Sequence, residues 1–136
     1  MKKLDNFTNS LNVLKSADFE RANEDEIYRT GVIGQFNLTF ELAWKSLRDV
    51  LRVHGVESAK TGSPREILQL GYAFGFLEDS AVWLVMLKKR NLVIHIYSEE
   101  EADELVLLIQ DSFIPALVTL AETLKEKLAE AGGDWS

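Results

Sequence analysis

The chain has 136 residues, of which 46% are hydrophobic and 27% charged, and its formal net charge is −7. These values predict one globular domain, residues 1–130, with a flexible C-terminal tail over residues 131–136. The lack of cysteine excludes disulfides and cysteine-ligated metals. No signal-peptide pattern and no apolar run near the roughly 18 residues of a membrane span is present, so we expect a cytoplasmic protein. The acidic charge argues against a general nucleic-acid-binding protein, and it favours a basic partner or a site completed by another subunit.

Helical signals begin at the N-terminus. Apolar residues at helical spacing predict a first helix over residues 2–19. An N-cap at Asn23, with Glu26 three residues later, predicts a long second helix that ends near His54. An apolar stripe that includes Trp44 marks the face of this helix expected to contact the core.

Capping residues divide the middle of the chain. Residues 56–62 are expected to form a loop. Ser63 and Glu66 have the spacing of a capping box around Pro64, and they predict a short third helix that ends near Gly75. Asp79 then fits the N-cap of a fourth helix, which leads to Arg90.

Ser98 and Glu101 predict the start of the last helix, which is expected to reach about Glu130 and to kink at Pro115. No strand pattern is present, so the sequence predicts an all-α protein, an up-and-down bundle of four or five helices. Residues 81–87 are apolar almost all round. This pattern is typical of a central helix or an oligomer interface, and a dimer would account for it.

The most informative motif lies in residues 88–98, where Arg90, Asn91, His95 and Tyr97 stand close together. An arginine can bind a phosphodiester, a histidine titrates near neutral pH, and a tyrosine hydroxyl can be modified. Five positions on a helix rotate by roughly 140°, so Arg90 and His95 cannot share a helix face. Either the helix ends between them, or they meet across a dimer axis.

Taken alone, the same run is also typical of an ordinary helix C-terminus. Lys88, Lys89 and Arg90 complement the helix dipole there, and His95 would interact with the last carbonyl groups. The motif is short enough to recur by chance, so its meaning depends on the rest of the chain.

The sequence resembles the HEPN-domain proteins known as nucleotidyltransferase substrate-binding proteins, or HepT-like toxins. The family motif Arg–x4–His–x–Tyr is matched by Arg90, His95 and Tyr97, and Asn91 follows the arginine as is common in the family. The resemblance covers residues 2–128, and its clearest segments are residues 36–51, 63–68, 82–100 and 114–117.

This resemblance implies a HEPN-like bundle, a homodimer and a metal-independent RNA endonuclease that acts as a toxin without a cofactor. Arg90 and His95 would be catalytic, with Asn91 in support. A small nucleotidyltransferase antitoxin would silence the toxin by transferring AMP to Tyr97. The alternative is a non-catalytic substrate-binding or regulatory partner subunit of a small nucleotidyltransferase.

Weaker signals surround the motif. The cations of the long helix are predicted to lie opposite its apolar stripe, as either a solvated face or a basic rim for RNA or an acidic partner. Glu41 precedes Lys45 in the order that favours an ion pair. His54 is expected to cap a helix end, and no histidine has the glutamate three residues earlier that a di-iron bundle needs. The candidate rim residues are Lys45, Arg48, Arg52, Lys88 and Lys89.

Overall fold

The computed structural model describes residues 1–90 and 98–132, and every regular element in these residues is helical. This confirms the prediction of an all-α bundle. The elements in chain order are α1 (Lys2–Lys15), α2 (Phe19–Glu24), α3 (Glu26–Val53), a 3-10 helix η1 (Glu57–Thr61), α4 (Pro64–Ala73), α5 (Ser80–Lys89), α6 (Glu99–Leu108), a π-helical segment (Ile109–Phe113) and α7 (Ile114–Glu130).

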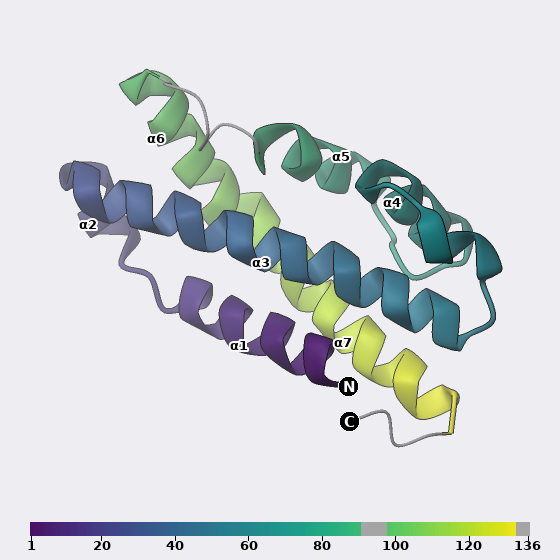
Figure 1. The fold of residues 1–136 in the computed structure, drawn as a ribbon. Coiled ribbons are helices and arrows are strands. Elements are labelled where there is room, and N and C mark those ends of the chain that lie inside the picture. The colour runs from purple at the N-terminus through teal and green to yellow at the C-terminus, as the bar shows by residue number, and fades with distance from the viewer. Residues whose placement is uncertain (91–97, 133–136) are drawn as a thin grey trace.

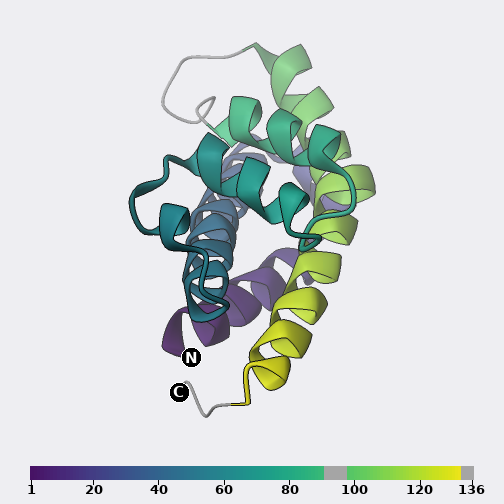
Figure 2. The same cartoon turned by 90° about the vertical axis from the view of Figure 1, so that its right-hand side faces the viewer.

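The longest helix, α3, is the central element of the bundle (Figures 1 and 2). It packs against α1, α2, α4, α6 and α7. Its apolar stripe is buried, and the ring of Phe36 stacks on Phe113 of the π-helical segment with centroids 5.0 Å apart. Trp44 is buried, as expected for the apolar stripe of this helix, and Trp83 of α5 is buried as well.

The N-terminal part differs from the sequence prediction. The first helix ends at Lys15, and Asp18 starts a separate short helix by accepting a hydrogen bond from the Arg21 amide. The N-cap of α3 is Asp25, whose side chain accepts from the Tyr28 amide, so the prediction of Asn23 was wrong. Two aspartates seven residues apart each satisfy orphan amides, and the chain therefore forms two helix starts where one was expected.

The caps in the second half agree with the sequence. Ser63 and Glu66 form the reciprocal capping box of α4, and Asp79 caps α5. The Ser63 backbone amide, with its hydroxyl, lowers the pKa of the Glu66 carboxyl by hydrogen bonding to it. Residues 56–62, expected as a loop, contain the 3-10 helix η1.

The final helix changes its hydrogen bonding at the position of Pro115. Immediately before the proline, the Ile114 amide donates to the carbonyl of Ile109, five residues back, which closes a π-helical turn. A wider turn relieves the contact between a proline ring and the preceding turn and compensates for the missing donor. A π-helical segment thus lies at the position of the predicted kink, while the kink itself stays a prediction.

The helical stretch Glu99–Glu130 is long and apolar enough to span a membrane by length and composition. This differs from the sequence-based expectation, because two charged residues are tolerated in such a window and no unbroken apolar run is needed. Its buried side chains, among them Leu105, Phe113 and Leu117, belong to the bundle core. Helices that form the core of a bundle share this length and composition, so these two properties are weak support for a membrane span.

Two further expectations can be checked in the described residues. Residues 81–87 do not form a central helix, because Trp83 and Met86 face the core while Val85 is 38% exposed. His54 is the C-cap of α3, and its Nε2 lies 2.6 Å from the carbonyl oxygen of Lys127 in the last turn of α7. It therefore joins two helix ends at one side of the bundle.

The start of α6 is attached to α3 by a buried arginine. Arg29 donates from Nη1 to Asp103 at 2.8 Å, and its Nη2 lies 3.8 Å from Glu99. The arginine is buried, whereas both carboxylates are largely exposed. The Arg29 guanidinium group is thus removed from water, and the carboxylates of Glu99 and Asp103 take the place of its water contacts.

We expect Arg29→Gln to lower the free energy of unfolding by about 2 kcal/mol, since a buried charge-assisted pair is lost. Urea denaturation measures this change, and hydrogen exchange should accelerate most in α6. Arg21→Gln is the matched control, because Arg21 pairs with Asp25 at 61% side-chain exposure. Equal effects of the two substitutions would contradict an anchoring role for Arg29.

Candidate functional site

Arg90 is the motif residue that the structure places. Helix α5 ends at Lys89, and Arg90 is its C-cap. A helix end at this point agrees with the first of the two arrangements expected for Arg90 and His95. Asn91, His95 and Tyr97 lie outside the described residues.

The Arg90 side chain reaches back to α3, where Glu41 binds it. Arg90 Nη1 donates to Glu41 Oε1 at 2.7 Å, and Trp44 Nε1 donates to Glu41 Oε2 at 3.0 Å. Each carboxylate oxygen therefore has its own donor. Trp44 is buried in the core, so its hydrogen bond fixes one oxygen of the Glu41 carboxylate. The other oxygen can then orient the guanidinium group of Arg90.

An aromatic platform lies beneath the arginine. The guanidinium carbon of Arg90 is 5.8 Å from the centre of the Phe40 ring, within the range of a cation–π contact. The Phe40 ring in turn packs on Trp83 of α5, with centroids 6.2 Å apart. The arginine is therefore oriented by one ion pair and one ring, both supplied by residues of α3.

Two buried polar atoms near this contact have no hydrogen-bond partner among the described residues. They are Arg90 Nε and Asn37 Oδ1. Asn37 lies four residues before Glu41, on the same face of α3. Buried unpaired polar atoms are rare in folded proteins, and functional sites are among the places where they occur.

Helix α3 holds both flanks of the motif segment. On one side Glu41 binds Arg90, and on the other Arg29 binds Glu99 and Asp103. Arg29 and Glu41 are twelve residues apart, which is about 18 Å along a helix. The residues that flank 91–97 on both sides are thus bound to one helix.

The cations predicted as a rim are not arranged as expected. Lys45 and Arg48 lie over the Trp44 ring, at 5.8 and 5.5 Å from its centre, and so flank the apolar stripe of α3 instead of facing away from it. The reason is that the aliphatic parts of both side chains can pack on an aromatic ring while the charges stay in solvent. The predicted pair of Lys45 with Glu41 is present at 4.0 Å.

The other rim candidates are more accessible. Arg52 is exposed near the end of α3, where it lines a surface cleft with Lys60 of η1. Lys88 is exposed and Lys89 is half-buried, both in the last turn of α5 next to Arg90. In the described part of the chain, no cluster of three histidine, aspartate or glutamate residues is arranged to hold a metal ion.

Sequence reasoning missed the partner of Arg90. It assigned Glu41 to Lys45, four residues away, whereas the shorter contact is to Arg90, 49 residues further along the chain. It also missed Arg29 as the anchor of α6. A charged residue inside a helix that is otherwise apolar on that face was the available signal for Arg29, but its partners could not be read from spacing.

Comparison with known proteins identifies the family. The family described as "Nucleotidyltransferase substrate binding protein like" matches residues 2–126. The chain belongs to this family. The match spans the described bundle almost completely and confirms the resemblance found in the sequence.

A named protein and a solved structure, both from Haemophilus influenzae, are similar to this member of the family. One, named "Probable ribonuclease HepT", is 26% identical over 99 residues, which cover 71% of this chain and 67% of that protein. The other is a solved structure described as the fold of a substrate binding domain of a nucleotidyltransferase. It superposes with a TM-score of 0.76 at 19% identity, over 90% of this chain and 98% of that one, and so supports the fold.

The contact between Glu41 and Arg90 can be tested directly. We expect Glu41→Ala to change the free energy of unfolding by less than about 1 kcal/mol, because the carboxylate is partly exposed. The Arg90 side chain should nevertheless become mobile. Side-chain ¹⁵N relaxation of the arginine Nε groups would report a lower order parameter for Arg90, with Glu57→Ala as the control. An unchanged Arg90 signal in Glu41→Ala would show that Glu41 does not orient it.

Proposed function

We propose that this protein is a HepT-like toxin, a metal-independent RNA endonuclease that needs no cofactor. The observation that carries the proposal is the position of Arg90 in a chain that matches the family over residues 2–126: Arg90 stands at a helix end, oriented by Glu41 and Phe40. The name of the relative, a probable ribonuclease, supports the same activity.

The proposed chemistry uses the nucleophile that RNA itself carries. The 2′-hydroxyl oxygen attacks the adjacent phosphorus, and the bond from phosphorus to the 5′-oxygen of the next nucleotide breaks. His95 and a second proton carrier remove the proton from the 2′-hydroxyl and supply one to the leaving 5′-oxygen. Arg90 binds the phosphate oxygens and stabilises the negative charge of the transition state, with Asn91 in a supporting contact.

The ion pair with Glu41 suits this role for Arg90. A guanidinium group has five N–H donors, and the bond to Glu41 uses one of them on Nη1. Other donors remain for a phosphate. An arginine already oriented before substrate binds loses less side-chain entropy when it closes on the phosphate, which favours binding in the transition state.

The proposed partner is a small nucleotidyltransferase antitoxin that transfers AMP to Tyr97. The added nucleotide brings bulk and a negative charge two residues from His95. Both effects oppose the approach of an RNA backbone. The family description, which pairs such chains with nucleotidyltransferases, supports this partner.

The proposed assembly is a cytoplasmic homodimer. Helix α5 supports it, because Trp83 and Met86 fill its core-facing side while the rest of residues 81–87 is also apolar. Val85 and its neighbours on the outer side remain available for a second copy. Since Arg90 follows directly after α5, a two-fold contact through this helix would bring two motifs near each other.

The second candidate is a non-catalytic subunit that presents substrate to a nucleotidyltransferase or regulates it. The family description and the solved structure of a substrate binding domain favour this candidate. It predicts a stable complex with the partner enzyme and no inhibition of growth when the chain is expressed alone.

The direct test is cleavage of RNA by purified, unmodified protein in the presence of EDTA. We expect cleavage by the wild type, and a loss of at least about a hundredfold in Arg90→Ala and in His95→Ala, because the loss of one transition-state donor or proton carrier has an effect of this size. Growth inhibition should disappear in the same variants. Equal cleavage by all three proteins would reject the assignment, and the absence of both cleavage and toxicity would favour the non-catalytic subunit.

The dimer contact has its own test. We expect Val85→Lys to convert a dimer to a monomer in sedimentation velocity, since a lysine at an apolar contact loses its hydration without a partner. Ile27→Lys is the control, because Ile27 is 86% exposed at the other end of α3. If Ile27→Lys dissociates the dimer and Val85→Lys does not, the interface lies on the first half of α3.

A further inference from the structure

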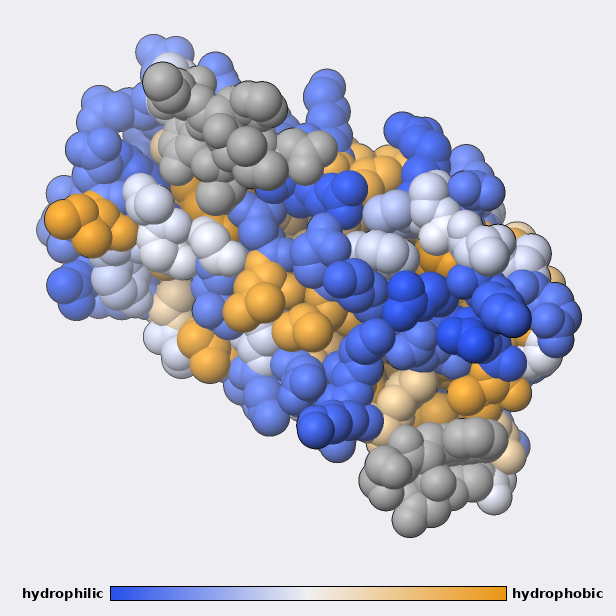
Figure 3. All heavy atoms as spheres, in the orientation of Figure 1, coloured by the Kyte–Doolittle hydropathy of each residue, from blue (hydrophilic) through white to orange (hydrophobic). Residues whose placement is uncertain are grey.

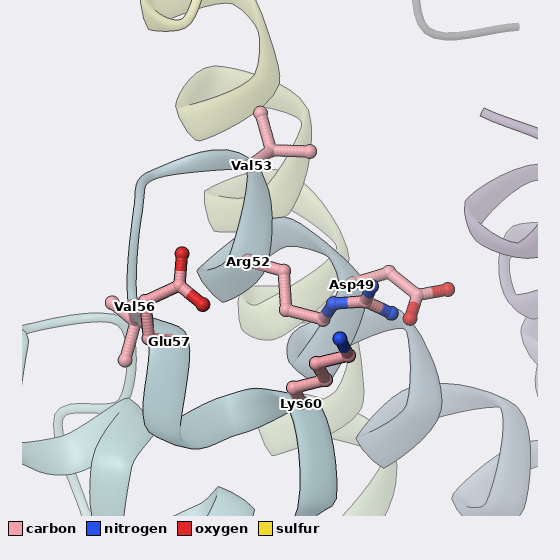
Figure 4. A pocket seen from close by; sticks show the side chains of 6 residues that line it. All are labelled: Asp49, Arg52, Val53, Val56, Glu57 and Lys60. Carbon is pink, nitrogen blue, oxygen red and sulfur yellow. The ribbon is translucent and has the colours of Figure 1, made fainter.

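A cleft at the C-terminal end of α3 brings together two basic side chains, Arg52 of α3 and Lys60 of η1. Its volume is about 610 Å³, and Asp49, Arg52, Val53, Val56, Glu57 and Lys60 line it. In Figure 4 the Arg52 and Lys60 side chains point toward the same side of the cleft, where Asp49 also lies, while the carboxylate of Glu57 lies on the other side. Two positive charges thus share one side of a cleft on the surface of a protein whose net charge is −7.

The acidic residue nearest to these cations is already neutralised. Asp49 Oδ1 accepts from Arg48 Nε at 3.1 Å, and Asp49 Oδ2 lies 3.5 Å from the Lys3 ammonium group. Neither Arg52 nor Lys60 has an ion-pair partner within 4.0 Å in residues 1–90 and 98–132. The cleft therefore contains two cations that repel each other and that an anion would stabilise.

The cleft is the end of a basic surface that begins at Arg90. Lys45, Arg48 and Arg52 follow at successive turns of α3 on the side where Glu41 binds Arg90. Glu41 and Arg52 are eleven residues apart, which is about 16 Å along the helix. Figure 3 shows strongly hydrophilic surface gathered over the C-terminal half of α3, in contrast to the apolar patches over its first half.

We propose that the Arg52–Lys60 cleft binds the phosphodiester backbone of the RNA strand whose scissile phosphate lies at Arg90. The inference rests on the proposed function, which supplies the ligand at the other end. Positive charges repeated at successive turns of α3 are suited to RNA, which carries one negative phosphate per nucleotide. Trp44, the aromatic residue along this path, is buried, so bases have no stacking partner there and the contact is independent of sequence.

The test measures binding apart from cleavage. A fluorescent single-stranded oligonucleotide with 2′-O-methyl riboses lacks the nucleophile and stays intact, and its anisotropy reports the affinity. The variant is Arg52→Gln/Lys60→Gln. The matched control, Lys15→Gln/Arg21→Gln, removes the same two charges at the opposite end of the bundle, from the end of α1 and from α2. Circular dichroism and thermal melting establish that both variants are folded.

We expect the cleft variant to bind the oligonucleotide about tenfold more weakly than the control. The slope of log Kd against log salt should fall by about 1.4, because each phosphate contact on a single strand contributes about 0.7. Equal affinity and slope in the two variants would overturn the inference. A poly-glutamate peptide is measured in parallel, and tighter binding of the peptide, lost in the cleft variant, would instead assign the cleft to an acidic polypeptide.

The outcome is separable from that of the proposed function. If Arg90→Ala and His95→Ala abolish cleavage while the cleft variant binds RNA like the control, the inference about the cleft fails alone. If the cleft variant loses RNA binding but the wild type cleaves no RNA, the nuclease assignment fails and the cleft remains a binding site for RNA.

Discussion

The structure of the site depends on the ion pair between Glu41 and Arg90. It connects the end of α5 to the middle of α3 across 49 residues of sequence, and Trp44 fixes the second oxygen of the same carboxylate. Three turns away, Arg29 connects the start of α6 to the same helix. A single long helix thus binds residues on both sides of the stretch 91–97, which contains Asn91, His95 and Tyr97. Such support from a rigid element is what a catalytic constellation needs to keep its geometry.

The distribution of charge gives this acidic protein a local basic surface. The cations on the C-terminal half of α3 are kept in place by few acids: Glu41 serves both Arg90 and Lys45, and Asp49 serves both Lys3 and Arg48. Each of these two carboxylates neutralises the charge of one cation. The other cation of each set therefore leaves a net positive charge on the surface. An overall charge of −7 would repel RNA at long range, so a short path of this kind would concentrate binding near Arg90.

Most of the fold follows from local chemistry, which is why the sequence predicts it well. The capping box of Ser63 and Glu66, the cap at Asp79 and the disruption at Pro115 all depend on residues within five positions of each other. The errors also arise locally. Asn23 and Asp25 are both good N-caps, but Asn23 lies inside α2 and Asp25 caps α3. The Tyr28 hydroxyl accepts a hydrogen bond from the Asp18 amide and so connects the start of α2 to the start of α3.

The site was predictable only in part, because its contacts join residues distant in sequence. The motif pointed to Arg90, but spacing assigned Glu41 to Lys45 and missed Arg29. The rim cations were expected to face away from the apolar stripe, whereas the Trp44 ring draws Lys45 and Arg48 towards it. Lys60 belongs to a 3-10 helix in a region expected as a loop, so its approach to Arg52 was not visible in any periodic pattern.

The most direct test of the whole account is an NMR titration of the arginine Nε–H signals with an uncleavable single-stranded RNA. The account predicts that Arg90 and Arg52 shift together and saturate at the same RNA concentration, while the buried Arg29 stays unchanged. RNA binding that leaves the Arg90 signal in place would contradict the claim that this residue, held by Glu41, receives the phosphate.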